Sequence, residues 1–222
     1  MPVNKTAYHQ IKAELDKIGV TLVAVSKTKP VEDILGLYEL GHRDFGENYV
    51  QELVDKAARL HKDIRWHYIG HLQTNKVKLI APFVQLIHGV DSLKLLEEIA
   101  KQAGKAGRVI DCLLQVHIAN EETKFGLDEK ELDELLDQYK REPVPGVRIK
   151  GLMGMASFTD NMNQVRAEFK KLKEIFDHHA RLTTHDSRFA TLSMGMSSDY
   201  KVAIEEGSTM ARIGSLLFGE RG

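Results

Sequence analysis

In the stretch Thr21-Leu-Val-Ala-Val-Ser-Lys27, apolar side chains occupy both alternating faces of the segment before Ser26. A strand with two apolar faces is typical of a parallel sheet that other layers cover on both sides. The stretch therefore predicts a buried parallel strand over residues 21–25. A lysine, Lys27, follows directly after its carboxyl end.

Seven further short apolar runs alternate with helix-like segments along the chain. They comprise residues 43–46, 66–69, 85–89, 112–118, 149–155, 190–194 and 210–213. Eight strands that alternate with helices predict an α/β fold, a single (β/α)8 TIM barrel that spans residues 1–222 as one domain. A doubly wound open sheet has the same alternation, and periodicity alone does not exclude it.

The composition, with 42% hydrophobic and 28% charged residues, is ordinary for a soluble globular protein. The 31 basic and 32 acidic residues nearly cancel, which argues against binding to nucleic acid or to a membrane surface through bulk charge. No apolar run approaches the roughly 20 residues that cross a bilayer, and the N-terminus lacks the apolar core of a signal peptide. With no apolar helix face evidently exposed, we expect a monomer.

The chain has one cysteine, Cys112, within an apolar stretch. One cysteine makes no internal disulfide, which favours a reducing, cytoplasmic location. Its apolar neighbours predict a buried core residue in preference to a nucleophile. His67 and His71 flank a strand end at a spacing that does not indicate a metal site, and we expect none.

The position of Lys27 predicts chemistry. Its side chain alternates with those of Val23 and Val25, so it is expected to point into the barrel, where catalytic groups lie at the carboxyl ends of strands. Desolvation lowers the pKa of a lysine amine and frees it to attack an aldehyde, forming a Schiff base. The alternative is a solvated lysine, like its neighbour Lys29.

The loops after the seventh and eighth predicted strands supply groups that bind phosphate. Barrels often bind phosphate at these two loops. The hydroxyl groups of Ser197 and Ser215 can donate to phosphate, and Gly214 lets backbone amides approach it closely. Arg212 lies two residues before Gly214, on the same strand face. Ser197 also fits a helix cap, and the carboxylate of Asp199 is expected to point away from a phosphate.

Together, a lysine after the first strand and these two loops predict a pyridoxal 5'-phosphate (PLP) site. The lysine would hold the aldehyde, and the arginine and the loops would hold the ring and the phosphate. Asn48, with Gln51 three residues later, resembles a helix capping box, and this role would explain the residue as well as a place near a cofactor would.

Several stretches resemble the pyridoxal phosphate homeostasis protein family, which is similar to the barrel domain of alanine racemase. They run in order through nearly the whole chain: residues 24–27, 45–52, 66–76, 120–126, 151–155, 192–197 and 212–214. The resemblance implies a (β/α)8 barrel that holds PLP on Lys27, with Arg212 facing the pyridine nitrogen.

The same resemblance implies further cofactor-binding residues. Ser197, Gly214 and Ser215 would bind the phosphate, and Asn48 would lie near the ring. Lys124, in the loop after the fifth strand, is a candidate for a second lysine that handles the cofactor transiently.

Three functions use such a site. In the first, the protein buffers PLP or delivers it to apo forms of PLP enzymes, and no catalytic residue is expected. In the second, it is a PLP-dependent amino-acid racemase of low activity. A racemase needs a second acid or base opposite the lysine, and the domain that supplies it in alanine racemase is not expected here, although Tyr49 could reach in. The third is a Schiff-base aldolase without cofactor, which the family motifs disfavour.

Overall fold

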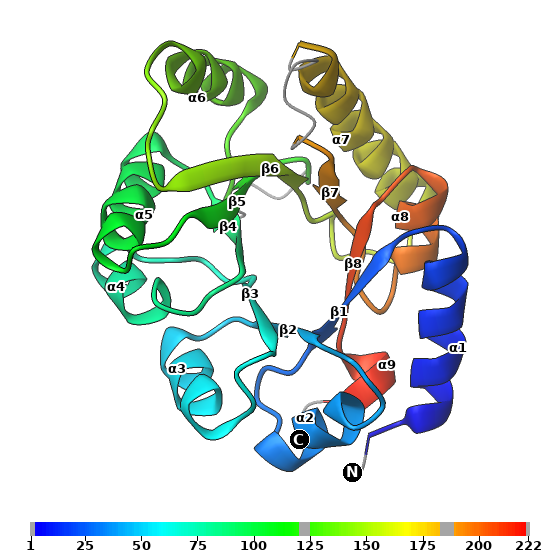
Figure 1. Ribbon diagram of the computed structural model, residues 1–222. Helices are drawn as coiled ribbons and strands as arrows, with labels where there is room; N and C mark the ends of the chain where they lie inside the picture. The colour runs from blue at the N-terminus through cyan, green and yellow to red at the C-terminus, as the bar shows by residue number, and fades with distance from the viewer. Residues whose placement is uncertain (1–2, 120–124, 183–188, 221–222) are drawn as a thin grey trace.

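The computed structural model describes residues 3–119, 125–182 and 189–220. Its eight strands are all parallel and close into one barrel in chain order, because β1 pairs with β8 as well as with β2 (Figure 1). The strands are β1 (Thr21–Val25), β2 (Asp44–Glu47), β3 (Arg65–Tyr68), β4 (Leu86–Val90), β5 (Ile110–Gln115), β6 (Val147–Met153), β7 (Thr191–Ser193) and β8 (Met210–Ile213). The predicted (β/α)8 barrel is confirmed, and the open sheet is excluded.

The sequence places all eight strands and the exact bounds of β1 and β8. The largest differences occur at β5 and β6, whose predicted segments start two residues too late and extend past the true ends. Beyond Gln115 the chain stays apolar, but it leaves the barrel ladder, and Val116 forms an isolated bridge with Leu127. Apolarity therefore continues beyond the paired segment, which explains the error.

Helices surround the barrel as a ring (Figure 1). They are α1 (Lys5–Lys17), α2 (Val31–Tyr38), α3 (Val50–Arg59), α4 (Val77–Ile80), α5 (Leu93–Lys105), α6 (Glu129–Arg141), α7 (Met162–Leu182), α8 (Tyr200–Glu205) and α9 (Ser215–Phe218), with a 3-10 turn η1 (Thr74–Lys76). Outward side chains of the strands, such as Leu22 and Ala24, pack with the helices in the main core. Cys112 belongs to this core and is fully buried, and burial raises the pKa of its thiol. It is a core residue, as predicted.

A second, smaller apolar cluster fills the inside of the barrel. It consists of one side chain from each of five strands: Val23, Leu86, Leu113, Met153 and Met210. Ion pairs between neighbouring strands lie toward the amino-terminal ends of the strands, where Asp44 bonds Arg65 and Asp111 bonds Arg148. The inside of the barrel is therefore a packed core.

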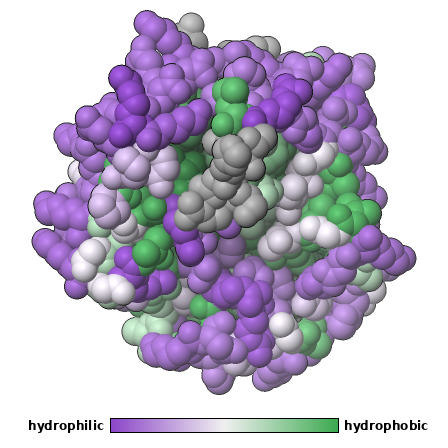
Figure 2. Space-filling view, turned by 45° about the horizontal axis from the view of Figure 1, so that its top comes forward, coloured by the Kyte–Doolittle hydropathy of each residue, from purple (hydrophilic) through white to green (hydrophobic). Residues whose placement is uncertain are grey.

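The outer surface is mainly hydrophilic on the face shown in Figure 2, with hydrophobic residues in small separate patches. Among the described helices, none combines the length and apolarity needed to span a bilayer.

The carboxyl end of β1 is held by a buried ion cluster on its outer side. The ammonium group of Lys56 donates three hydrogen bonds of 2.7 Å, to the Ser26 carbonyl oxygen, to Glu47 Oε1 and to Glu52 Oε1. The Ser26 hydroxyl also donates to Glu47 Oε1, at 2.6 Å. The Thr28 N–H donates to Glu52 Oε1 at 2.6 Å. The residues on both sides of Lys27 are thus bonded to one cluster.

This cluster also offsets an unfavourable backbone. Thr28 has a φ of 62°, a left-handed conformation that is costly for a β-branched residue. Burial raises the pKa of Glu47, although Lys56 and Ser26 oppose that effect. The side chain of Glu47 is fully buried, so the ammonium of Lys56 is its main electrostatic compensation.

We predict that Lys56→Met destabilises the protein strongly. The substitution keeps the length of the side chain but leaves Glu47 buried without its cation, which costs about 3–5 kcal/mol of the free energy of unfolding. The loss should shrink as pH falls, because a protonated Glu47 needs no cation. Urea unfolding at two pH values measures both effects.

The matched control is Lys130→Met. Lys130 pairs with Glu134 on the surface, where the two side chains are 84% and 68% exposed. Such a pair contributes little, so this variant should stay within about 0.5 kcal/mol of the original protein. Equal losses in the two variants would show that the buried cluster does not hold β1.

Candidate cofactor site

A cavity opens at the carboxyl ends of the strands, where barrels place their functional groups. Its volume is about 570 Å³, within the range of small-molecule sites. The six residues that the sequence singled out for cofactor binding all line it: Lys27, Asn48, Ser197, Arg212, Gly214 and Ser215. These residues come from loops after β1, β2, β7 and β8 and from β8 itself, so only closure of the barrel brings them together.

Lys27 enters the cavity from the loop after β1. Val25, two residues earlier, lines the same cavity, as the alternation of side chains predicts. Lys27 is partly buried. Lys29 also lines the cavity, but its ammonium donates to the Glu220 carbonyl oxygen at 2.8 Å. Two lysines therefore stand at one rim.

Arg212 forms the inner wall of the cavity and is 4% exposed. Its Nη1 donates to the Ser193 carbonyl oxygen at 2.9 Å and to Ser193 Oγ at 2.7 Å, and its Nη2 donates to the Gly154 carbonyl oxygen at 3.1 Å. Burial lowers the pKa of Arg212 to about 10, against an opposing effect of Asp199. At neutral pH it remains a cation.

Three of the five N–H groups of Arg212 are used in these bonds. Its other two make no hydrogen bond to any residue that the structure describes. A buried cation with N–H groups to spare is suited to an acceptor on a ligand.

The loops after β7 and β8 meet at the other side of the cavity. The Gly214 N–H donates to Ser197 Oγ at 3.1 Å. The helix-cap alternative for Ser197 is wrong, because the residue that precedes α8 is Asp199 and makes no side-chain cap. As expected, the carboxylate of Asp199 is turned to the backbone, where Oδ1 accepts from the Met196 N–H at 2.6 Å.

Asn48 does not cap α3. The residue before that helix is Tyr49, and no side chain caps the helix. The capping-box interpretation was wrong because the chain stays extended for one residue more than the pattern assumed. Instead Asn48 lines the cavity, and its Oδ1 is buried without a hydrogen-bond partner among the described residues. An unsatisfied buried acceptor is rare and costly, and a donor on a ligand would satisfy it.

The site also includes side chains that the sequence did not predict. Ile69 follows β3, and Phe158, which is 89% exposed, follows β6. Ile69 has the same place after its strand as the predicted residues have after theirs, so topology could have found it. Phe158 lies on an irregular loop with no such signal. Lys124 lies outside the described residues.

The lining of the cavity combines positively charged side chains with apolar ones. Lys27, Lys29 and Arg212 carry the cations, and Met155 and Met196 supply apolar surface beside them. Of the residues described, no three histidine, cysteine, aspartate or glutamate side chains gather closely enough to hold a metal ion. Such a cavity suits a flat anionic ligand, and a lysine at its rim can bond covalently to an aldehyde.

Comparison with known proteins gives a consistent picture. The model of the family described as "Alanine racemase, N-terminal domain" matches residues 5–222. The pyridoxal phosphate homeostasis protein of Aquifex aeolicus (strain VF5) is 45% identical over 201 residues, which are 90% of this chain and 86% of the relative.

Two solved structures of PipY from Synechococcus elongatus PCC7942 have a similar fold. The one without PLP gives a TM-score of 0.90, and the one with PLP bound gives 0.88. Both are 35% identical in sequence, and the match covers 96% of this chain and 99% of PipY. The chain therefore belongs to the pyridoxal phosphate homeostasis protein family, and its barrel is of the alanine racemase N-terminal type.

Proposed function

We propose that this protein binds PLP as a Schiff base on Lys27 and buffers or delivers the cofactor without turning over a substrate. One observation carries the proposal. Lys27, the buried cation Arg212 and the Ser197–Gly214 pair line one cavity of suitable size. The relative PipY, whose structure has PLP bound, supports the same ligand.

The residues present fit this cofactor group by group. PLP would supply an aldehyde, and Lys27 would provide the amine that bonds to it. The spare N–H groups of Arg212 would donate to the pyridine nitrogen. Ser197, Gly214 and Ser215 would bind the phosphate, and the unsatisfied Oδ1 of Asn48 would accept from a donor near the ring.

The lining gives less support to a racemase. Racemisation needs a second proton donor and acceptor across the ring from the lysine. In the described part of the chain, the cavity is lined by no tyrosine, histidine or cysteine. Tyr49, the candidate from sequence, is 57% exposed and lines a neighbouring cleft. A guanidinium at the pyridine nitrogen would also keep that nitrogen unprotonated, which makes the ring a poor electron sink.

The names of the relatives agree with the carrier role, because they are called homeostasis proteins. The cytoplasmic location, the monomeric state and the delivery to apo PLP enzymes stay predictions from the sequence.

We predict that the purified protein, loaded with PLP, has a visible absorption band that Lys27→Ala abolishes. Lys29→Ala is the matched control, since Lys29 lines the same rim and its variant should keep the band. Hydride reduction and peptide mass mapping should place the cofactor on Lys27. A retained band in Lys27→Ala, with the cofactor on another lysine, would overturn the assignment. A protein that never gains a band would favour the cofactor-free aldolase.

We predict that Arg212→Ala weakens PLP binding about tenfold or more, since a hydrogen bond from a charged group is lost. Fluorescence titration measures the affinity. Arg212→Lys tests whether a positive charge alone is enough for PLP binding. It also provides a second variant to measure if Arg212→Ala does not fold. Arg166→Ala, which breaks only surface ion pairs with Glu205 and Glu206, is the control. Equal affinity in Arg212→Ala and the original protein would mean that Arg212 only supports the barrel end.

We predict that the PLP-loaded protein changes its absorption spectrum little during incubation with a panel of L-amino acids and exchanges no α-hydrogen with heavy water. The reason is that no tyrosine, histidine or cysteine lines the cavity in the described part of the chain, so none of these can supply the second proton transfer. Mass spectrometry of the recovered amino acids measures the exchange. Time-dependent exchange above that of PLP alone would establish a racemase instead.

A further inference from the structure

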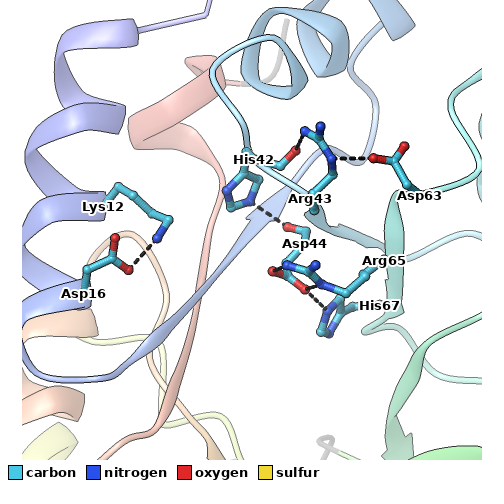
Figure 3. Close-up of polar contacts among 8 residues, drawn as sticks. All are labelled: Lys12, Asp16, His42, Arg43, Asp44, Asp63, Arg65 and His67. Carbon is cyan, nitrogen blue, oxygen red and sulfur yellow. Dashed lines mark hydrogen bonds and ion pairs between the residues drawn. The ribbon is translucent and has the colours of Figure 1, made fainter.

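A chain of hydrogen bonds crosses the inside of the barrel and ends at Arg212. Ser193 Oγ, which accepts from Arg212, lies 3.1 Å from His88 Nδ1. His88 Nε2 lies 3.0 Å from His67 Nδ1, and His67 Nε2 lies 3.1 Å from Asp44 Oδ1. Ser193 and the two histidines are at most 3% exposed. Figure 3 shows the outer end of the chain, with Asp44 between Arg65 and His67.

This series of hydrogen bonds joins residues of separate strands, so it forms only when the barrel closes. Asp44, His67 and His88 belong to the consecutive strands β2, β3 and β4, while Ser193 belongs to β7. Because β4 and β7 are not neighbours in the barrel, the bond between His88 and Ser193 crosses its interior. The chain thus connects the amino-terminal end of β2 with the wall of the cofactor cavity.

The direction of every bond follows from the donors available. Arg212 has only donors, so Ser193 Oγ accepts from it. The one acceptor for the Ser193 hydroxyl proton among the described residues is His88 Nδ1. A neutral His88 then carries its proton on Nε2 and donates to His67 Nδ1. His67 in turn donates from Nε2 to Asp44. All four bonds point from Arg212 toward Asp44.

The charge states agree with this direction. Burial would raise the pKa of Asp44, but hydrogen bonds from Arg65 and His67 outweigh it and hold that pKa below its ordinary value. Burial, helped by the charge of Arg212, lowers the pKa of His88 well below its ordinary value. Asp44 is therefore ionised and His88 neutral, as the bond directions require.

The series of hydrogen bonds can help to stabilise the buried positive charge of Arg212. Arg212 is a buried cation, yet none of the described carboxylates lies within ion-pair distance of it, and its acceptors are neutral oxygens. Hydrogen bonds in series polarise one another in a low-dielectric interior. An anion at the end of the series makes Ser193 Oγ a stronger acceptor for the guanidinium.

We propose that Asp44, His67 and His88 are positioning residues, which act through Ser193 to hold the Arg212 guanidinium in place and to stabilise its charge against the cofactor ring. This inference rests on the proposed binding of PLP. It assigns a role in cofactor affinity to a carboxylate that does not line the cavity.

The test compares two carboxylates of the barrel that are equally exposed. Asp44 and Asp111 each bond an arginine of the next strand, and both side chains are 15% exposed. Of these two, only Asp44 also bonds His67, which belongs to the series of hydrogen bonds. Asp44→Asn keeps an acceptor for His67 but removes the negative charge. Asp111→Asn also removes a negative charge of equal exposure, but Asp111 does not belong to the series of hydrogen bonds that ends at Arg212.

PLP affinity is measured first in the unchanged protein, because lack of binding there refutes the proposed function and this inference with it. Where PLP binds, Asp44→Asn should weaken it about three- to tenfold, and Asp111→Asn should leave it unchanged. Equal affinities in these two variants overturn only the inference.

A double-mutant cycle tests whether the effect passes through Arg212. In an Arg212→Ala background, Asp44→Asn should have no further effect on PLP affinity. A full, additive loss in that background contradicts the proposal.

A second measurement needs no cofactor. The ring-nitrogen chemical shifts of ¹⁵N-histidine-labelled protein should place the proton of both His67 and His88 on Nε2. His88→Gln and Ser193→Ala should alter the His67 signals while the protein stays folded. A proton on Nδ1 of either histidine in the unchanged protein would reverse the chain and refute the proposal.

Discussion

Pairing between the first strand and the last makes the site. β1 and β8 are joined in register from Thr21 with Met210 to Ala24 with Ile213, and Val23 stands opposite Arg212. Parallel pairing sets the carboxyl ends of two strands side by side. The loop with Lys27 and the loop with Gly214 therefore share one mouth, although they lie near opposite ends of the sequence. Without this closure the lysine, the arginine and the groups proposed to bind phosphate have no common cavity.

Two buried polar systems stabilise the cations that face this cavity, one on each side of the barrel wall. Outside the wall, Lys56, Glu47 and Glu52 hold the backbone on both sides of Lys27. Inside it, the series of bonds that starts at Ser193 supports Arg212. Burying such groups costs free energy that apolar residues of the same size would not cost. One system ends at Arg212 and the other at the two neighbours of Lys27, so their benefit is the geometry of the site.

The sequence predicts the features that depend on local pattern. Alternating apolar runs give the eight strands, and strand-end positions give five of the six predicted cavity residues, because in a barrel every such end faces the same side. The role of Asn48 could not be derived in the same way. A polar residue just before a helix has a local explanation as a cap, and only the three-dimensional structure shows its Oδ1 buried and unsatisfied.

The buried polar residues that support the cavity could not be predicted either, because their contacts also depend on the three-dimensional structure. Lys56 lies within an amphipathic helix, where a lysine ordinarily faces solvent, yet it is 5% exposed. His67 and His88 lie on neighbouring strands, and the bond to Ser193 crosses the barrel. Contacts of this kind depend on the number and tilt of the strands, which no spacing along the chain encodes.

The layout of the site is consistent with reversible storage. A carrier must bind its ligand specifically but release it, so its affinity should come from few strong contacts. In the proposed complex the covalent contact would come from a partly buried lysine at the rim, while Arg212, which is buried, would hold the ring from the inner wall. The rim is where water or a recipient amine can reach the bond to Lys27 first. If PLP is held as proposed, release would begin at the lysine while Arg212 and the phosphate loops still held the rest of the cofactor.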